Sequence, residues 1–161
     1  MQDKHRVRRA VAKLIQRAPW IAVSARWFYR LTQPRFSAGV VGVVLNAHGE
    51  VLLVEHVFHP YHPWGLPGGW VGRREDPSET LVREMREELE LQVNVGPVLL
   101  VKLDYDNHID MAYLCQQAGP IGVLSAELLS YRWTSLNDLP RLQPFHYLAI
   151  QRALEIGVKA P

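Results

Sequence analysis

The sequence predicts an α/β domain, an α/β/α sandwich with a mixed β-sheet, preceded by a separate helical segment. Two observations favour this class. Short apolar, β-branched stretches are joined by turn residues, and helical patterns stand between groups of such stretches rather than after every one. The basic residues gather at the start of the chain, which separates an N-terminal appendage from the rest.

The composition allows one sizeable core and excludes several protein classes. Of 161 residues, 48% are apolar and 21% are charged, which is not typical of collagen, low-complexity disorder or a disulfide scaffold. The single cysteine, Cys115, cannot form an internal disulfide, so we expect a reducing, cytoplasmic environment. We expect Cys115 to be a small buried residue on a strand, not a metal ligand.

The net charge of +2 hides a strong asymmetry. Up to residue 35 there are nine cations and one anion, a net charge of +8, which leaves −6 for the remainder. We therefore expect a basic appendage over residues 1–35 and a domain over residues 36–161, with the boundary near Gln33-Pro34. The nine cations are Lys4, Arg6, Arg8, Arg9, Lys13, Arg17, Arg26, Arg30 and Arg35.

The appendage has the pattern of two amphipathic helices. Apolar residues recur at helical spacing from Val7 to Ala18, basic residues lie on the other side, and Pro19 ends this helix. A second short helix is expected over residues 20–31. Neither stretch has the ~20 apolar residues needed to cross a bilayer, and a signal peptide is not expected.

Four roles for the appendage remain open at this level. Its helices could pack on the domain or across a homodimer, or they could contact an anionic membrane surface or a phosphate-rich ligand. Specific nucleic-acid binding is not expected, because no recognised nucleic-acid module accompanies the charge.

The domain begins with a predicted hairpin. Residues 39–45 and 51–57 are apolar, and Asn46 to Glu50 form a turn between them. A loop rich in Pro, His and aromatic residues follows over 58–64, and then the run Gly65-Leu-Pro-Gly-Gly-Trp70.

A helix is predicted over residues 77–89. Asp76 has the chemistry of an N-cap, Pro77 suits the first helical position, and Glu79 stands three residues after the cap. Beyond this helix we expect a turn at 106–108, strands at 91–95, 98–104, 109–117 and 130–134, and a final helix over about 144–156.

The predicted helix carries three glutamates along one edge of its core contact. On a helical wheel, an apolar stripe consists of Leu81, Val82, Met85 and Leu89. The carboxylates lie beside that stripe, on Glu84, Glu87 and Glu88. Like charges at this spacing repel, and a divalent cation with oxygen ligands would compensate. A solvated Glu/Arg-rich helix is the alternative, but Gly65, Gly68 and Gly69 just before it would let the backbone approach a ligand.

These residues also resemble a known family. Gly69, Glu75 and the run Arg83-Glu-Met-Arg-Glu-Glu-Leu-Glu-Leu91 closely resemble the Nudix box, Gly-x5-Glu-x7-Arg-Glu-U-x-Glu-Glu-x-Gly-U with U aliphatic. The likeness extends over roughly residues 38–156, including the first hairpin and the segment 131–140. One position departs, because Glu90 stands where the family has Gly. That Gly follows the helix end, where left-handed backbone is favoured, so Glu90 should cost about 1 kcal/mol or change the helix end, while removing no ligand.

The resemblance implies a pyrophosphohydrolase that uses Mg²⁺ or Mn²⁺. Its substrate would be a nucleoside diphosphate derivative, such as a nucleotide sugar, a dinucleotide or a nucleoside triphosphate. The implied metal ligands are the carboxylates of Glu84, Glu87 and Glu88 and the carbonyl of Gly68. Arg83 is expected to orient Glu84 or Glu87, and Glu75 to tether the loop to the helix start or to reach the metal through water.

The general base and the substrate contacts are less defined. Glu87 or Glu88 could act through water at the metal, or Glu127 could act from a loop; the other acids outside the box are Asp104, Asp106 and Asp110. Substrate contacts are expected from His59, Tyr61, His62, Trp64, Tyr105, His108 and Phe145, with ordinary packing as the alternative for each. A catalytically silent Nudix domain that binds ligands, or a membrane-surface module, remains the alternative function.

Overall fold

The computed structural model describes residues 2–104 and 106–157. The chain divides into two compact units, Met1–Arg35 and Phe36–Pro161.

The N-terminal unit consists of two helices, α1 (Gln2–Arg17) and α2 (Pro19–Thr32). Pro19 does end the first helix, and it also stands at the first position of the second, where its missing N–H is not needed. The Ala18 N–H donates to the Leu14 carbonyl and the Ile21 N–H to the Ala18 carbonyl, which joins the helices through a tight turn. In the described part of the chain, no helix is long and apolar enough to cross a membrane.

The second unit is built on one mixed sheet. Its strands are β1 (Ser37–Leu45), β2 (Val51–His56), β3 (Trp64–Gly65), β4 (Gly68–Trp70), β5 (Val93–Leu103), β6 (His108–Gln117) and β7 (Leu128–Thr134). The order is β3-β2-β1-β6-β5, with β4 paired to β1 and β7 to β2. Strands β1 and β6 run parallel over their whole shared length, while the other pairs are antiparallel.

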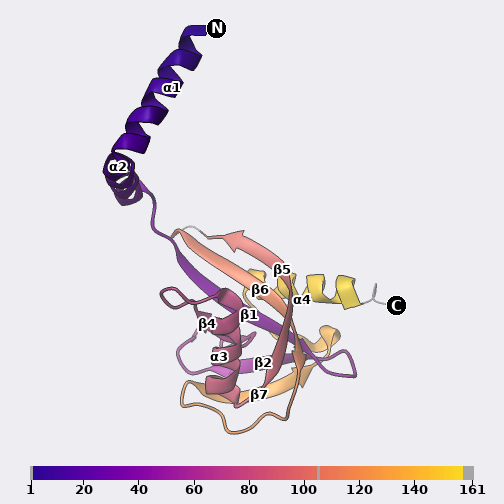
Figure 1. Ribbon diagram of the computed structural model, residues 1–161. Helices are drawn as coiled ribbons and strands as arrows, with labels where there is room; N and C mark the ends of the chain where they lie inside the picture. Colours follow the sequence, from indigo (N-terminus) through magenta and orange to yellow (C-terminus); the bar gives the residue numbers. More distant parts are fainter. Residues whose placement is uncertain (1, 105, 158–161) are drawn as a thin grey trace. The chain divides into compact units, whose positions relative to one another are not determined.

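Two helices cover the two faces of this sheet, as Figure 1 shows: α3 (Pro77–Leu89) one face and α4 (Pro144–Gly157) the other. The side chains of the strands alternate between the two cores, since Val44 packs with α3 whereas its neighbour Val43 packs with α4. The predicted α/β/α sandwich with a mixed sheet is confirmed. A short 3₁₀ turn (Leu136–Asp138) lies between β7 and α4.

Three local features differ from the prediction. The first hairpin is short, because β1 and β2 pair at Leu45 and Val51 and then separate to pair with other strands. The separate strands expected at 91–95 and 98–104 form one strand, β5, whose register is irregular between Val95 and Leu100. This irregularity, on an edge strand, accommodates Pro97, which has no N–H for the ladder. The short strands β3 and β4 were not predicted.

Cys115 lies where the strand pattern placed it. It is a buried free thiol in the core beneath α3, with Met111 and Tyr113 packed against the same core. Burial raises the pKa of its thiol to about 12, so the residue stays neutral and unreactive at physiological pH.

Candidate active site

Helix α3 begins at a well-formed cap. The Asp76 carboxylate accepts hydrogen bonds from the Ser78 N–H at 2.9 Å and from the Ser78 hydroxyl at 2.6 Å, and Pro77 occupies the first turn. This is the helix start that the sequence predicted. It sets the rotation of α3 and hence which side chains face the sheet.

The buried stripe of α3 is narrower than the helical wheel suggested. Leu81, Met85 and Leu89 are fully buried, but Val82 is 41% exposed, so its assignment to the core was wrong. Val82 stands at the margin of the stripe, on the flank opposite the glutamates, where it lines a cavity together with Val95 and Gly96 of β5. On the other margin, Glu88 is buried instead.

Glu88 is the most unusual group of the site. Its side chain is 6% exposed, and its Oε2 atom has no hydrogen-bond partner within the described structure. Burial raises the pKa of this carboxyl to about 7, and the negative charges of Glu84, Glu127 and Glu87 add to the effect, while a hydrogen bond from the Gly68 N–H opposes it. A buried carboxyl oxygen without a partner is costly unless a ligand or ion completes it.

Arg83 connects the other two glutamates. One of its terminal nitrogens donates to Glu84 Oε1 at 2.9 Å and to Glu87 Oε2 at 3.0 Å. Burial nevertheless raises the pKa of Glu84, although the hydrogen bond to Arg83 acts in the opposite direction. The expectation that Arg83 orients these two side chains agrees with this geometry.

The same guanidinium binds Glu75, which lies in the loop before α3. Arg83 Nε is 2.8 Å from Glu75 Oε1, and its second terminal nitrogen is 3.2 Å from Oε2. The Gly72 N–H also donates to Glu75 Oε2, at 3.0 Å. The hydrogen bond from Arg83 lowers the pKa of Glu75 to about 2. Glu75 thus ties the loop to the helix, one of the two roles considered for it.

Two glycines bring the β4 backbone against these carboxylates. Gly68 has φ of 153°, and a Cβ there would collide with the Val40 carbonyl of β1. A Cβ on Gly69 would fall on the Glu84 carboxylate. Position 68 therefore requires glycine because of its contact with the β1 backbone, whereas glycine at position 69 leaves room for the Glu84 carboxylate.

A loop after β6 closes the C-terminal end of α3. The N–H of Gly122 donates to the Leu89 carbonyl and that of Ser125 to the Glu88 carbonyl, both at 2.9 Å. Glu90 has the left-handed backbone expected for the family's glycine, with φ of 49°, and its carboxylate accepts from the Val123 N–H at 3.1 Å. The loop leads to Glu127, whose charge acts on both Glu84 and Glu88.

The donor set fits a hard divalent cation. Carboxylate oxygens are the ligands that Mg²⁺ and Mn²⁺ prefer, and Glu88 offers one that accepts no hydrogen bond from any described residue. Within the described residues, no three His, Cys, Asp or Glu side chains already stand in an arrangement that could hold a metal ion. Arg83 contacts one oxygen of Glu84 and one of Glu87, so these side chains would have to adjust to ligate together with Glu88.

The expected substrate residues do not form one group. His59 is exposed, His62 is half-buried, and Trp64 carries the Arg132 guanidinium 4.1 Å from its ring centroid. Tyr105 lies outside the described residues. Phe145 is 7% exposed and belongs to the core under α4, which favours the alternative of ordinary packing for this residue.

Sequence reasoning missed a cluster of histidines beside β3. The rings of His56 and His59 are 4.6 Å apart, and His146 Nδ1 on α4 accepts the Leu66 N–H at 3.1 Å. Burial lowers the pKa of His146 to about 4, with further contributions from His56, His59 and His62. No sequence motif joins these positions, since α4 follows β3 by some eighty residues, and only the fold brings them together.

At another rim of the site, His108 and Trp70 lie side by side, with ring centroids 4.6 Å apart. His108 Nε2 is 3.2 Å from Asp110 Oδ1, and its Nδ1 is 2.8 Å from the Ser37 hydroxyl. Asp110 is therefore engaged by His108.

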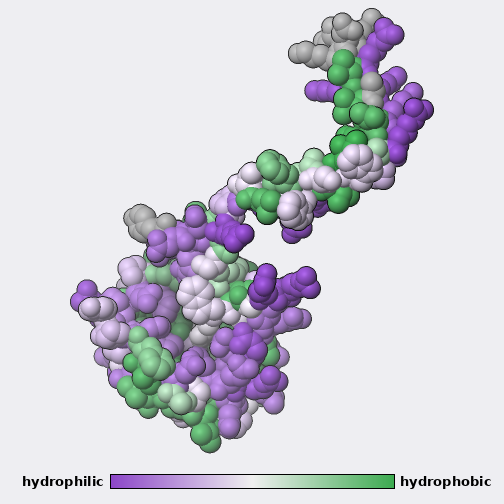
Figure 2. Space-filling view, turned by 90° about the vertical axis from the view of Figure 1, so that its left-hand side faces the viewer, coloured by the Kyte–Doolittle hydropathy of each residue, from purple (hydrophilic) through white to green (hydrophobic). Residues whose placement is uncertain are grey.

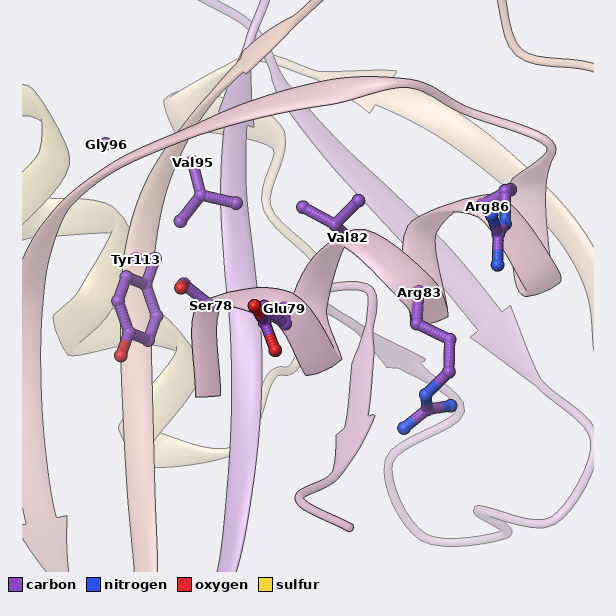
Figure 3. A pocket seen from close by; sticks show the side chains of 8 residues that line it. All are labelled: Ser78, Glu79, Val82, Arg83, Arg86, Val95, Gly96 and Tyr113. Carbon is purple, nitrogen blue, oxygen red and sulfur yellow. The ribbon is translucent and has the colours of Figure 1, made fainter. Parts of the chain in front are cut away.

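A cavity of about 590 Å³ lies on the opposite flank of α3 (Figure 3). It is lined by Ser78, Glu79, Val82, Arg83, Arg86, Val95, Gly96 and Tyr113. In Figure 3 the Arg83 guanidinium points away from Val82 and Val95. Arg83 lines this cavity and also contacts Glu84 and Glu87, whereas Glu88 does not line the cavity.

The chain was compared with known proteins. A family model described as NUDIX domain matches residues 35–153. The human protein nucleoside diphosphate-linked moiety X motif 6 is 28% identical over 114 residues, which are 65% of this chain and 36% of the human protein. The chain thus spans about a third of the length of that relative.

Solved structures share the fold. A MutT NUDIX hydrolase from Burkholderia pseudomallei superposes with a TM-score of 0.66 and 25% identity, covering 74% of this chain and 98% of that one. A UDP-X diphosphatase superposes with a TM-score of 0.68 over 98% of this chain and 81% of its own. The second likeness, at 15% identity, is one of fold alone.

Proposed function

The chain belongs to the NUDIX family of pyrophosphohydrolases, and on this premise we propose that it hydrolyses the diphosphate linkage of a nucleoside diphosphate derivative with Mg²⁺ or Mn²⁺ bound beside α3. A nucleotide sugar, a dinucleotide and a nucleoside triphosphate are the candidate substrates. The name of the human relative, nucleoside diphosphate-linked moiety X motif 6, supports this class of small nucleotide substrate.

The single observation that carries the proposal is the burial of the Glu88 carboxyl group with one oxygen that has no hydrogen-bond partner among the described residues. A carboxyl group that is 6% exposed, has an unpartnered oxygen and lies among other glutamates is unfavourable by itself. A purely structural helix would gain stability from an apolar residue at this position. Glu88 and the neighbouring glutamates would hold a divalent cation here, and its charge would compensate the repulsion between these carboxylates.

Each neighbouring residue then has a defined role. Glu88, Glu84 and Glu87 would hold the metal, and the backbone of Gly68 lies against Glu88, as its N–H contact shows. Arg83 is a positioning residue, because it fixes one oxygen of Glu84 and one of Glu87. Glu75 holds Arg83 in place. The bound metal would supply charge neutralisation at the diphosphate oxygens.

Two sources of the general base remain in the proposal. Glu87 or Glu88 could accept the proton of the attacking water, or Glu127 could do so from the loop after β6. Glu127 is exposed, and its charge acts on Glu84 and Glu88, so it lies near enough to take part. A Glu127→Gln variant separates these alternatives, because a loss of kcat with unchanged metal affinity identifies Glu127 as the base.

The substrate class is tested with the purified full chain. Nucleotide sugars, dinucleotides and nucleoside triphosphates are incubated with Mg²⁺ or Mn²⁺, with a matched series in EDTA, and products are identified by chromatography. Metal-dependent release of a nucleoside monophosphate from at least one class is the expected result. No hydrolysis anywhere, together with retained nucleotide binding, would instead support a silent ligand-binding domain.

Cys115 is a buried free thiol, so the fold does not depend on oxidising conditions. A reducing cytoplasm remains the compartment that we propose.

A further inference from the structure

The N-terminal unit exposes many large apolar side chains. In α1, Val7 is 62% and Leu14 is 59% exposed, and no residue of α2 is buried. The exposed set in α2 includes two tryptophans and other large side chains, namely Trp20, Val23, Trp27, Phe28, Tyr29 and Leu31. A soluble surface rarely leaves so many large apolar groups together in water.

Most of these groups lie on one side of each helix; Tyr29 of α2 is an exception and lies on the opposite side. On α1, Val7, Val11 and Leu14 follow helical spacing. Figure 2 shows hydrophobic (green) surface along this helix beside hydrophilic (purple) surface. On α2, Trp20, Trp27 and Leu31 share one face, whereas Arg26 and Arg30 project from its flank. A helix with Lys and Arg on its polar face and Trp, Phe or Leu on the other is typical of segments that lie in a membrane interface.

We propose that residues 1–35 dock this protein on an anionic lipid surface. The charge of this unit is complementary to such a surface, since residues 1–35 contain nine cationic side chains and one anionic side chain, that of Asp3. The apolar stripes would enter the boundary between headgroups and acyl chains, where the amphipathic rings of Trp20 and Trp27 are favoured. Helices of 16 and 14 residues are too short to span the bilayer, so they would lie along it.

Other binding partners would account for only one of the two features of this surface, its exposed apolar side chains or its positive charge. A second copy of this unit would cover the apolar stripes, but it brings the same +8 charge and no acidic partners apart from Asp3. A nucleic acid would neutralise the cations and leave Val7 and Leu14 in water. The remainder of the chain carries −6 and is repelled by anionic lipid, so attraction must come from residues 1–35.

The test uses the full chain and vesicles of two compositions, phosphatidylcholine alone and phosphatidylcholine with phosphatidylserine at 3:1. We expect co-sedimentation with the anionic vesicles only, and a steep loss when salt rises from 0.1 to 0.5 M. Replacing four basic residues of α1 by Gln (R6Q, R9Q, K13Q and R17Q together) should weaken binding at least tenfold. A matched variant with four exposed cations of the domain replaced (R86Q, K102Q, R141Q and R152Q) should bind like the wild type.

A second variant separates insertion from simple charge attraction. W20S combined with W27S keeps every charge, so an at least tenfold loss of binding shows that the apolar face enters the lipid. Far-ultraviolet circular dichroism checks that the helices remain in each variant. The binding readout does not require hydrolysis, so its failure is distinct from failure of the proposed enzymatic function.

Three results would overturn the proposal. Equal binding to both kinds of vesicle would remove the role of anionic lipid, and wild-type binding by the α1 charge variant would remove the role of these cations. A stable dimer in light scattering, with no vesicle binding, would show that a second copy covers the apolar stripes.

Discussion

The guanidinium of Arg83 holds the carboxylate of Glu75 at two points, with Nε 2.8 Å from Oε1 and a terminal nitrogen 3.2 Å from Oε2. The remaining terminal nitrogen contacts Glu84 and Glu87, so one side chain connects the loop before α3 to two proposed metal ligands. Planar, forked geometry makes arginine suited to this position, and lysine cannot reproduce it.

Replacing Arg83 by Gln should therefore lower kcat by ~10–100-fold, because a partner that orients ligands is lost. Arg83→Lys should restore only part of the activity, since its single ammonium group cannot bind at two points. Arg86→Gln removes a cation from an exposed position of the same helix and should leave kcat unchanged. Wild-type kcat in the Gln variant would show that Arg83 has no positioning role.

Gly69→Ala should displace the Glu84 carboxylate while the fold remains. The added Cβ meets the flexible end of a side chain, so the cost to the free energy of unfolding should stay below ~1 kcal/mol. Mn²⁺ affinity, measured by titration calorimetry, should fall at least tenfold. Gly119→Ala, where the nearest atom is 4.0 Å away, is the matched control. If both variants bind Mn²⁺ equally well, Glu84 is not a ligand.

Metal affinity should depend on pH through Glu88. The pKa of about 7 means that a proton occupies this carboxyl at lower pH and must leave before a cation binds. The dissociation constant for Mn²⁺ should then rise up to ~10-fold for each pH unit below 7. Glu88→Gln should bind weakly and without this dependence. A constant affinity from pH 6 to 8 in the wild type would exclude Glu88 as a ligand.

Position 90 tests the cost of a left-handed residue after α3. Glu90→Ala keeps the strained φ of 49° and loses the contact with the Val123 N–H, whereas Glu90→Gly loses the contact but relieves the strain. The Gly variant should therefore be more stable than the Ala variant by about 1 kcal/mol. Urea denaturation gives both values, and equal stability would mean that the left-handed conformation is not strained.

Acid should weaken the fold through the buried histidines. Burial lowers the pKa values of His146 and His56 to about 4, from the usual 6.5. Between pH 4 and pH 6.5 these side chains are therefore protonated in the unfolded chain and neutral in the folded chain. The free energy of unfolding should fall as pH drops from 6.5 towards 4. His146→Asn keeps an acceptor for the Leu66 N–H and should show a smaller decrease. If the free energy of unfolding of this variant depends on pH as in the wild type, His146 does not contribute to the acid sensitivity.

Much of the fold was predictable because local chemistry and tertiary structure agree. Asp76 and Pro77 start α3 as expected, and the strand alternation around Val43 and Val44 matches two cores. Prediction from the local sequence failed where pairing with a distant strand determines the secondary structure. Residues 93–103 form one strand although Gly96-Pro97 interrupts the local pattern, because β6 pairs on both sides of the irregularity.

The candidate site was predictable to a similar extent. The motif located Glu84, Glu87, Glu88 and Arg83 on one helix, since their contacts are set by helical spacing. It could not show that Glu88 is the buried member, because burial depends on β4 and on the loop that closes the end of α3. His146 was missed because its contact with the β3 region depends on how α4 packs on the sheet.

The central claim is that the buried carboxyl of Glu88 serves metal-dependent hydrolysis, and one comparison tests it most directly. Glu88→Gln and Glu79→Gln, the latter an exposed glutamate of the same helix, are assayed with Mg²⁺ on the best substrate of the panel, alongside far-ultraviolet circular dichroism. We expect kcat to fall at least ~100-fold in the first variant and to remain unchanged in the second, with both folded. Wild-type turnover by a folded Glu88→Gln protein would contradict the account.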